Sequence, residues 1–575
     1  MNKLILSALI IVCSYSLALA QGKAPKWMNK SRKAVLTVTT FDKDNRQLHT
    51  GIAFFVSENG EILSSYSLFK GAARAQVTDP DGKSYSVERI WGADEVYDII
   101  RVQASVSKKV EFLPVANDPV LTGSPVYFLP FSTDKKPVFK EGQIVEVSKL
   151  SGAYSYYKVS MPLASKDVNT PILTATGEVI GLAQEDASGK NEQSYAASAG
   201  YAHSLRIGST DFLSSTYNSI AIKKAWPEDA EQASVALFIG RSTQTPQQYL
   251  ETVNDFIATF PNSPDGYTTR ASHYAVYRKT LASSSTDERT YLDKALEDIN
   301  TAARYSNKPG DANYNRAKLI FDIAATDSTI TQQGWSVDDA LNAVNQAISE
   351  DDQPVYRQLQ GDISFYQQKF EDAYNAYMKI NESDMATAET YYMAAKAKEN
   401  ITGFNIGDVI ALLDKAIEKT GTPPGATAAT YILERVEWKM KLMMYAEAVA
   451  DYDLYYNAVG GRVEAPFYYY REQAKFRAGD LTGALADIQQ AITMDSTPDY
   501  LAEEASVYIR LEDYTKAMVS LDKALDKAPD FASCYRLKGI CLIRQNKKNE
   551  ACEAFNKAKE LGDPLANRLI REHCK

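Results

Sequence analysis

The chain has 575 residues, of which 45% are hydrophobic and 24% are charged. This length exceeds what one hydrophobic core can organise, and the composition excludes a largely disordered chain, so several folded domains are expected. The net charge of −10 argues against a nucleic-acid-binding protein, because such proteins present a basic face to the phosphates.

The first 20 residues have the pattern of a secretory signal peptide. Lys3 supplies a positive charge, Leu4–Leu17 is an apolar run, and Ala18–Ala20 offers a small-residue cleavage site, so Gln21 is the expected mature N-terminus. A lipoprotein signal is disfavoured because the residue before Cys13 is not small. An uncleaved anchor is the alternative. We expect export to the periplasm or cell envelope, and no later stretch of the sequence predicts a membrane span.

The segment 34–208 is predicted to be all-β, after a linker at 21–33. Apolar residues recur with period two in runs such as 35–41, and turn pairs such as Asn59-Gly60 separate these runs. Helical periodicity is missing from this segment. Short strands with regular turns over such a length favour a β-barrel or a β-sandwich.

Three motifs in this segment resemble those of HtrA-type, trypsin-fold serine proteases. Residues 51–63 resemble the strand–turn–strand opening of the family, 92–102 its aspartate motif, and 171–181 the stretch that follows its nucleophile. The three occur in the family's order and spacing. The resemblance implies a trypsin-like double barrel.

The resemblance also places the family's catalytic triad on Ser67, Asp98 and Val168. Only the carboxylate is of the family's type, and the glycines of the oxyanion hole are replaced by Lys166 and Asn169. Acyl transfer needs a nucleophile, a base within hydrogen-bond reach and donors for the oxyanion. We therefore predict a pseudoprotease with vestigial triad positions and no enzymatic activity. Asp98 is then a strand-start carboxylate that bonds local backbone N–H groups.

Other residues offer little replacement for that triad. His49 and His203 are the histidines of the β segment, and neither lies in a motif with a nucleophile. A relocated triad is therefore disfavoured. The sequence contains no metal-ligand cluster, phosphate loop or dinucleotide motif, so neither a metal nor another cofactor is expected.

After a predicted linker at 209–235, the segment 236–575 has helical periodicity and an internal repeat of about 34 residues. Small residues mark the repeat at Ala295, Ala340, Ala448, Ala484, Ala517 and Ala551, the last three intervals being 36, 33 and 34 residues. Twelve residues earlier stand Gly361, Ala505 and Gly539 in three of the repeats. This pattern resembles the tetratricopeptide repeat (TPR), which implies an all-α solenoid of about eight repeats with a C-terminal capping helix.

A row of basic residues is predicted along this array. Counted from the Gly/Ala position, one equivalent site holds Lys441, Arg477, Arg510 and Arg544. In the TPR family that site lies near the end of the helix that lines the concave face, and Arg536 would point into the same groove. Such a row would bind an acidic segment or a carboxyl terminus. The alternative is that these cations only complement helix dipoles.

Four cysteines remain after signal cleavage: Cys534, Cys541, Cys552 and Cys574. The first two are seven residues apart on one predicted helix, about 10.5 Å of rise, which is too far for a disulfide. We predict a disulfide between Cys552 and Cys574, which would tie down the end of the array. Four buried thiols are the alternative.

Three functions are compatible with this organisation. The favoured one is a non-catalytic envelope scaffold that binds a protein or peptide partner through the TPR groove and uses the pseudoprotease domain for docking. The alternatives are an active trypsin-like endopeptidase with unorthodox residues and a periplasmic chaperone. Ser67 and Val168 disfavour the endopeptidase.

Overall fold

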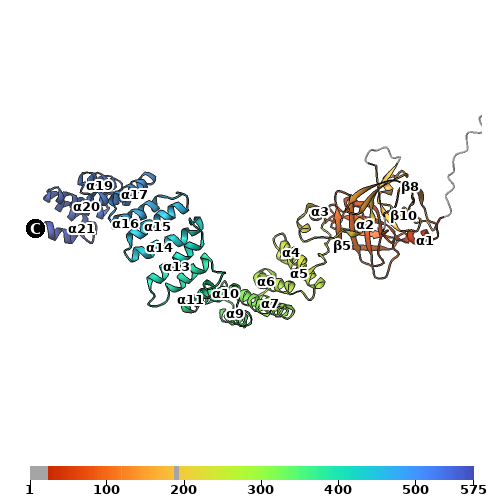
Figure 1. Ribbon diagram of the computed structural model, residues 1–575, viewed down its shortest axis with the longest axis horizontal. Coiled ribbons are helices and arrows are strands. Elements are labelled where there is room, and N and C mark those ends of the chain that lie inside the picture. Colours follow the sequence, from red (N-terminus) through yellow and green to blue (C-terminus); the bar gives the residue numbers. More distant parts are fainter. Residues whose placement is uncertain (1–23, 118, 187–192, 575) are drawn as a thin grey trace, which may run out of the picture. The chain divides into compact units, whose positions relative to one another are not determined.

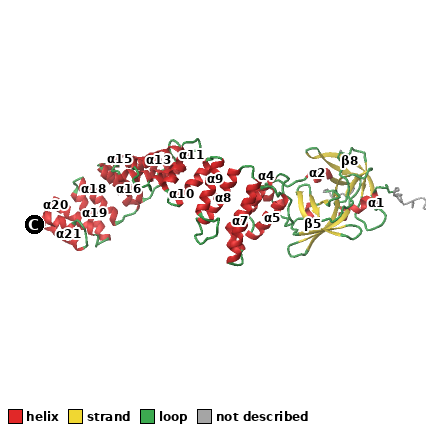
Figure 2. Cartoon of the chain, turned by 90° about the horizontal axis from the view of Figure 1, so that it is seen from below, coloured by secondary structure: helices red, strands yellow, loops and turns green. Residues whose placement is uncertain are grey.

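A computed structural model describes residues 24–117, 119–186 and 193–574 (Figure 1). The predicted signal peptide at 1–20 lies outside these ranges. The chain divides into two compact units, Met1–Tyr305 and Ser306–Lys575. The first contains all the described strands and the first long helices, and the second is built of helices alone (Figure 2).

Among the described residues, the strands form two closed antiparallel barrels of six strands each. The first has the order β1-β2-β3-β6-β5-β4, from β1 (Val35–Phe41), β2 (Gln47–Phe55), β3 (Glu61–Ser64), β4 (Arg74–Thr78), β5 (Ser84–Asp94) and β6 (Ile99–Ala104). The second has the order β10-β11-β12-β9-β8-β7, from β7 (Pro125–Phe128), β8 (Lys140–Ser151), β9 (Tyr154–Val159), β10 (Pro171–Thr174), β11 (Val179–Gln184) and β12 (Ser194–Ser198). This confirms the predicted trypsin-like double barrel followed by helices.

The alternation seen in the sequence fills these barrels. In β1, Leu36, Val38 and Thr40 are buried while the residues between them are partly exposed. Closure leaves no unpaired strand edge, so every strand contributes side chains to an interior. The two barrels also share a core, because Leu173 and Leu182 of the second barrel pack in the same buried cluster as the first.

Part of the expected linker at 209–235 is packed rather than free. It contains η4 (Asp211–Leu213), α3 (Ser215–Asn218) and the start of α4 (Ala230–Gly240). Tyr217, Ile220 and Ile222 are buried in the core of the first barrel. The Ala225 N–H donates to the Ile90 carbonyl at 2.8 Å. The stretch between α3 and α4 has no periodic sequence pattern, because its backbone hydrogen bonds go to the barrel and not to a regular element of its own.

The first unit continues with α5 (Pro246–Thr259), α6 (Pro264–Leu281) and α7 (Ser285–Tyr305). The side chain of Asp255 on α5 is only 8% exposed and accepts hydrogen bonds from Arg89 on β5 at 2.5 and 3.0 Å. These neighbours hold the pKa of the Asp255 carboxyl below its ordinary value against the opposing effect of burial. The first helices are therefore fixed to the barrel by a buried ion pair.

In the second unit, consecutive helices pack against one another in pairs, as in a helical solenoid. The described helices are α8 (Pro309–Ala324), α9 (Val337–Glu350), α10 (Pro354–Tyr366), α11 (Phe370–Asn381), α12 (Ala388–Lys398), α13 (Ile406–Lys419), α14 (Ala429–Lys441), α15 (Tyr445–Ala458), α16 (Ala465–Ala478), α17 (Leu481–Met494), α18 (Pro498–Arg510), α19 (Tyr514–Lys527), α20 (Ala532–Arg544), α21 (Lys548–Glu560) and α22 (Ala566–His573). The repeat found in the sequence corresponds to these pairs.

Small residues sit where the helices of a pair come closest. A Cβ atom at Gly361 would lie 2.6 Å from the ring of Tyr377, and one at Gly539 would lie 2.4 Å from the ring of Phe555. Both rings are fully buried. In these two repeats the glycine therefore leaves room for the aromatic side chain that faces it on the partner helix.

Candidate functional site

Ser67 and Asp98 lie together in the first barrel. Ser67 belongs to the short helix η2 (Tyr66–Leu68) after β3, and Asp98 precedes β6 with a positive φ of 49°. The Ser67 N–H donates to Asp98 Oδ1 at 2.6 Å, and the Ser67 hydroxyl donates to Oδ2 at 3.0 Å. The buried hydroxyl of Ser65 also donates to Oδ2. The donors to this carboxylate are one N–H and two hydroxyls of the turn at η2, 31–33 residues earlier in the chain, rather than N–H groups next to it in sequence.

The hydroxyl pair beside Asp98 cannot act as the imidazole of a triad. A serine hydroxyl at neutral pH neither accepts a proton readily nor carries a positive charge, so it is a poor general base. The Ser65 and Ser67 oxygens lie 2.9 Å apart. This cluster links the η2 turn to Asp98 at the start of β6.

The histidines have other partners in the described structure. The His203 Nε2, on α2 (Ala199–Ser204), lies 3.2 Å from the Glu61 carboxylate, which also pairs with the buried Arg101. His49 is exposed on β2. The buried His273 shares a hydrogen bond of 2.8 Å with the Pro246 carbonyl, and burial lowers its pKa. No recorded contact within the described ranges brings a histidine to Ser67 or Asp98.

Val168 follows the short helix η3 (Ser165–Asp167) and packs partly buried against the core of the second barrel. Its side chain contains only carbon and hydrogen, so the position has no nucleophilic atom. The neighbouring Lys166 is exposed, and Asn169 is buried with a φ of 67°. The valine therefore continues the apolar core at the position that the resemblance assigns to the nucleophile.

The backbone around Val168 is also hydrogen-bonded within the protein. The N–H groups of Asp167, Asn169 and Thr170 donate to carbonyls at 2.7, 2.8 and 3.1 Å, and that of Val168 donates more weakly, at 3.5 Å. A trypsin-type oxyanion hole uses the N–H groups of the nucleophile position and of the residue two before it, which correspond here to Val168 and Lys166, and both must point at the substrate. The Val168 N–H is directed at the Ser165 carbonyl instead. The backbone N–H groups of this loop donate within and around η3 and, from Asn169, to the Ala183 carbonyl.

The predicted row of cations falls at the helix ends in the second unit. Lys441, Arg477, Arg510 and Arg544 are exposed in the last turns of α14, α16, α18 and α20. Lys441 pairs with Glu437 at 2.7 Å and lies over the ring of Trp438. Arg477 and Arg510 lie 6.0 and 5.7 Å from the ring centres of Tyr445 and Phe476. These last-turn positions also suit the alternative explanation, that the cations complement helix dipoles.

Arg536 differs from the other four cations. It is bound to the buried Asp563 through a hydrogen bond of 2.9 Å. This pair ties α20 to the turn that precedes α22. A guanidinium held in this way is less available to a partner than the exposed residues of the row.

A pocket of about 520 Å³ lies beside one member of this row. Its apolar lining comes from Leu433, Val436, Met440 and Tyr452, and Arg477 and Glu437 are charged residues at the same pocket. The sequence row alone did not indicate an apolar cavity at this repeat. The Gly/Ala position of this repeat holds Val436, whose larger apolar side chain does not by itself predict a cavity.

The same position holds a glutamate in the next repeat. Glu472 is fully buried, its Oε2 accepts a hydrogen bond from Gln473 at 2.7 Å, and its Oε1 has no partner among the described residues. Burial, and next the charge of Glu503, raise the pKa of Glu472 to about 8. The repeat register could have found this residue, because a carboxyl twelve residues before Ala484 breaks the small-residue rule.

The cysteines near the C-terminus fall into two classes. Cys552 and Cys574 form a disulfide with a Cα–Cα distance of 5.7 Å, which joins α21 to the end of α22. Cys534 and Cys541 are free and buried. Burial raises the pKa of these two thiols to about 12 and about 11, so they remain protonated and unreactive at neutral pH.

None of the helices in the described part of the chain combines the length and apolarity needed to cross a bilayer. Within the same residues, no group of three or more metal-binding side chains is gathered.

Residues 50–182 match the family model of the trypsin-like peptidase domain. Among solved structures, the chain is similar to the HtrA-type protease AlgW with a tripeptide, at 18% identity and a TM-score of 0.27, over 31% of this chain and 62% of that chain. It is also similar to the active form of the Rv3671c protease from M. tuberculosis, at 17% identity and a TM-score of 0.27, over 32% of this chain and 85% of that chain. No curated protein sequence matches the chain.

Proposed function

We propose that this protein is a non-catalytic scaffold of the cell envelope. In this proposal the trypsin-like domain is a pseudoprotease that serves as a docking module. The helical region is a TPR array that binds a protein or peptide partner. The observation on which the proposal rests is the pair of triad positions Ser67 and Val168, one bonded to Asp98 as a hydroxyl donor and the other packed in a barrel core.

The repeat contacts support the TPR assignment. Gly361 and Gly539 each face a buried aromatic ring on the next helix, at the spacing that the sequence repeat predicts. Stacked helix pairs of this kind present an extended surface suited to peptides. The exposed cations Arg477, Arg510 and Arg544 support an acidic segment or a carboxyl terminus as the bound element.

Two observations support export. The N-terminal pattern around Lys3 and Ala18–Ala20 is that of a signal peptide. The Cys552–Cys574 disulfide is a bond that persists in oxidising compartments and is rare in the cytosol.

A fluorophosphonate serine probe tests the absence of catalysis. We expect no covalent labelling of the purified mature chain and no casein hydrolysis above background. Ser65→Ala and Ser67→Ala are matched variants, because these are the two hydroxyls at Asp98. Labelling that either variant abolishes would reject the pseudoprotease and establish the unorthodox endopeptidase.

Crosslinking in intact cells, followed by affinity measurement with the captured protein, tests partner binding. We expect a combined Arg477→Gln, Arg510→Gln and Arg544→Gln variant to bind more weakly and to lose part of its salt dependence. A combined Lys523→Gln, Lys527→Gln and Lys559→Gln variant is the control, because it removes three exposed charges from the second helices of the pairs. Equal affinity and salt dependence of the two variants would assign the row to helix ends only.

A further inference from the structure

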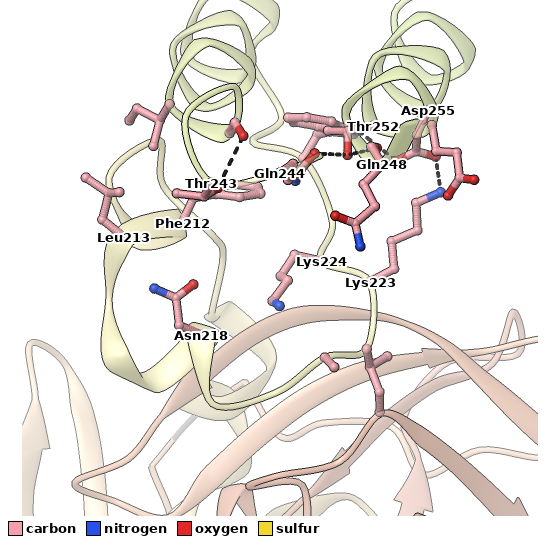
Figure 3. A pocket seen from close by; sticks show the side chains of 16 residues that line it. Phe212, Leu213, Asn218, Lys223, Lys224, Thr243, Gln244, Gln248, Thr252 and Asp255 are labelled. Carbon is pink, nitrogen blue, oxygen red and sulfur yellow. Dashed lines mark hydrogen bonds and ion pairs between the residues drawn. The ribbon is translucent and has the colours of Figure 1, made fainter. Parts of the chain in front are cut away.

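A pocket of about 640 Å³ lies within the first unit, beside the segment that follows the barrels (Figure 3). Its walls come from residues 212–226 and from α4 and α5, including the turn between them. Pockets of this size hold small ligands or the terminal residues of a peptide. The trypsin-like motifs do not include any of these residues.

Lys224 supplies a positive charge to this pocket. It is half-buried, and its ammonium donates to the Ile220 carbonyl at 2.5 Å. Within the described residues, no carboxylate is recorded as its partner. Two of the three ammonium hydrogens are thus left for a ligand. Burial lowers the pKa of Lys224 because it disfavours the charged form of the ammonium. An anion bound beside the ammonium would favour the charged form again.

The adjacent Lys223 is paired with a carboxylate, so it is less available to an anionic ligand than Lys224. Lys223 pairs with Asp255 at 2.6 Å, and Asp255 also accepts hydrogen bonds from Arg89 and from the Trp226 indole. Figure 3 shows Lys223 reaching Asp255 while Lys224 extends into the open space beneath the helices. Glu251 also lines the pocket and is exposed. Of the two lysines, Lys224 is therefore the one whose charge is not paired with a carboxylate among the described residues.

Polar amides flank this ammonium. In the view of Figure 3, Asn218 and Gln248 lie on either side of Lys224, and both line the pocket. Gln244 is fixed by a hydrogen bond from the Thr252 hydroxyl at 2.8 Å. Amide N–H groups beside a lysine are donors of the type that a carboxylate accepts.

Another part of the pocket lining is apolar and aromatic. Phe212 and Trp226 stack with ring centres 5.6 Å apart, and Leu213 and Ile239 extend this apolar lining. Leu213 is 58% exposed, which is high for a leucine next to a cavity. A ligand that fits both sides must combine an anionic group with an apolar body.

We propose that this pocket binds a carboxylate that is attached to an apolar or aromatic group, with Lys224 as the anion-binding residue. The carboxylate belongs either to a free small acid or to the C-terminal residue of a peptide. The site is independent of the scaffold function, since it involves neither the triad positions nor the second unit.

Calorimetric titration of the full mature chain tests this site with three probes: N-acetylphenylalanine, its amide, and a tetrapeptide of three glycines ending in phenylalanine with a free carboxylate. We expect the acid to bind and the amide to bind at least about tenfold more weakly, because the charge-assisted hydrogen bonds are lost. Tighter binding of the tetrapeptide than of the acid would identify a peptide terminus as the ligand, and the reverse would identify a free acid.

Lys224→Gln is expected to weaken binding of the acid at least about tenfold, while Lys224→Arg retains most of it. Lys43→Gln is the matched control, since it removes an exposed lysine from the first barrel. The acid–amide comparison on the unmodified chain does not depend on how the variants fold. Equal affinity for acid and amide, no binding of any probe, or unchanged binding in a folded Lys224→Gln variant would each overturn the proposal.

Discussion

The barrel domain and the helical region follow sequence patterns of different kinds. In the barrels, the residues that make strands and turns follow the trypsin-like pattern, while the positions assigned to the base and the nucleophile hold Ser67 and Val168. In the helices, the recurring residues are themselves the packing contacts, as in Gly539 against Phe555. A catalytic side chain contributes little to folding, so its replacement leaves a fold intact, whereas a packing residue cannot change without a compensating change nearby.

Ion pairs with a buried carboxylate also recur between the two helices of a pair. Asp451 on α15 binds Arg435 and Lys439 of α14, at 2.6 and 2.8 Å. The same arrangement recurs 36 residues later in Asp487 of α17, which binds Arg471 and Lys475 of α16 at 2.6 and 2.8 Å. Such charges stabilise a helix pair only while each has its partner.

The largest predicted effect is therefore that of Asp487→Ala. It leaves Arg471 and Lys475 partly buried without their shared carboxylate, and we expect the second unit to lose about 3–5 kcal/mol of unfolding free energy. Asp453→Ala is the control, because Asp453 also binds Arg471 but is half exposed, and its loss should cost less than about 1 kcal/mol. Equal destabilisation in urea titrations of the two variants would contradict a structural role for the buried carboxylate.

Gly539→Ala tests the packing rule of the repeat. The added methyl group would lie 2.4 Å from the buried ring of Phe555, and we expect a loss of about 1–3 kcal/mol. Gly240→Ala on α4 is matched, since its Cβ would meet atoms only at 3.7 Å or more, and it should be neutral or stabilising. Calorimetry measures both variants, and hydrogen exchange on α20 and α21 localises the effect of Gly539→Ala. A neutral Gly539→Ala would show that the helices of this pair separate easily.

Glu472→Gln tests the residue that breaks this rule. The pKa of Glu472 is raised from 4.5 in the unfolded chain to about 8 in the folded protein, so wild-type stability should fall as the pH rises from about 4.5 to about 8. Gln cannot ionise, so the variant should lose this dependence and exceed the wild type by roughly 1–2 kcal/mol at pH 8.

The exposed Glu447→Gln on α15 serves as its control, with the wild-type slope retained. Chemical denaturation at pH 5 and pH 8 provides the measurement. Parallel pH profiles for Glu472→Gln and the wild type would place the titrating group elsewhere.

Local patterns made most of the fold predictable. Alternation in β1 and the 34-residue spacing of small residues each report a contact that recurs along the chain, so both fold class and order were accessible. The sequence predicts a linker for the segment with Tyr217 and Ile222, because the bonds of this segment go to a distant barrel strand rather than to neighbours in sequence. Irregular backbone held by long-range contacts leaves no periodic signal.

The candidate sites were predictable to different degrees. The neighbourhood of Ser67 and Asp98 followed from motif order, because the family's scaffold positions are kept. The backbone bonding around Val168 and the buried partner of Arg536 depend on how loops fold, which single residues do not reveal. The Lys224 pocket joins two stretches of irregular and helical chain and has no motif at all.

The smallest predicted effect belongs to the barrels, and it separates loss of side chains from loss of the surrounding geometry. Val168→Ser combined with Ser67→His restores the residue types of the triad beside Asp98. We nevertheless expect peptidase activity to stay at background. The Val168 N–H, which would be one of the two oxyanion donors, is directed at the Ser165 carbonyl at 3.5 Å inside η3. The catalysis that such a donor supplies, about 10²–10³-fold, therefore stays absent.

Casein hydrolysis and fluorophosphonate labelling of the double variant measure this, with Val168→Ala plus Ser67→His as the control that has a base but no nucleophile. Labelling of the serine variant without turnover would mean that the nucleophile is activated while the oxyanion is unsupported, as the backbone bonding predicts. Turnover well above the alanine control would instead show that the η3 loop rearranges to free its donors. In that case the proposed lack of activity would depend on two side chains rather than on the backbone.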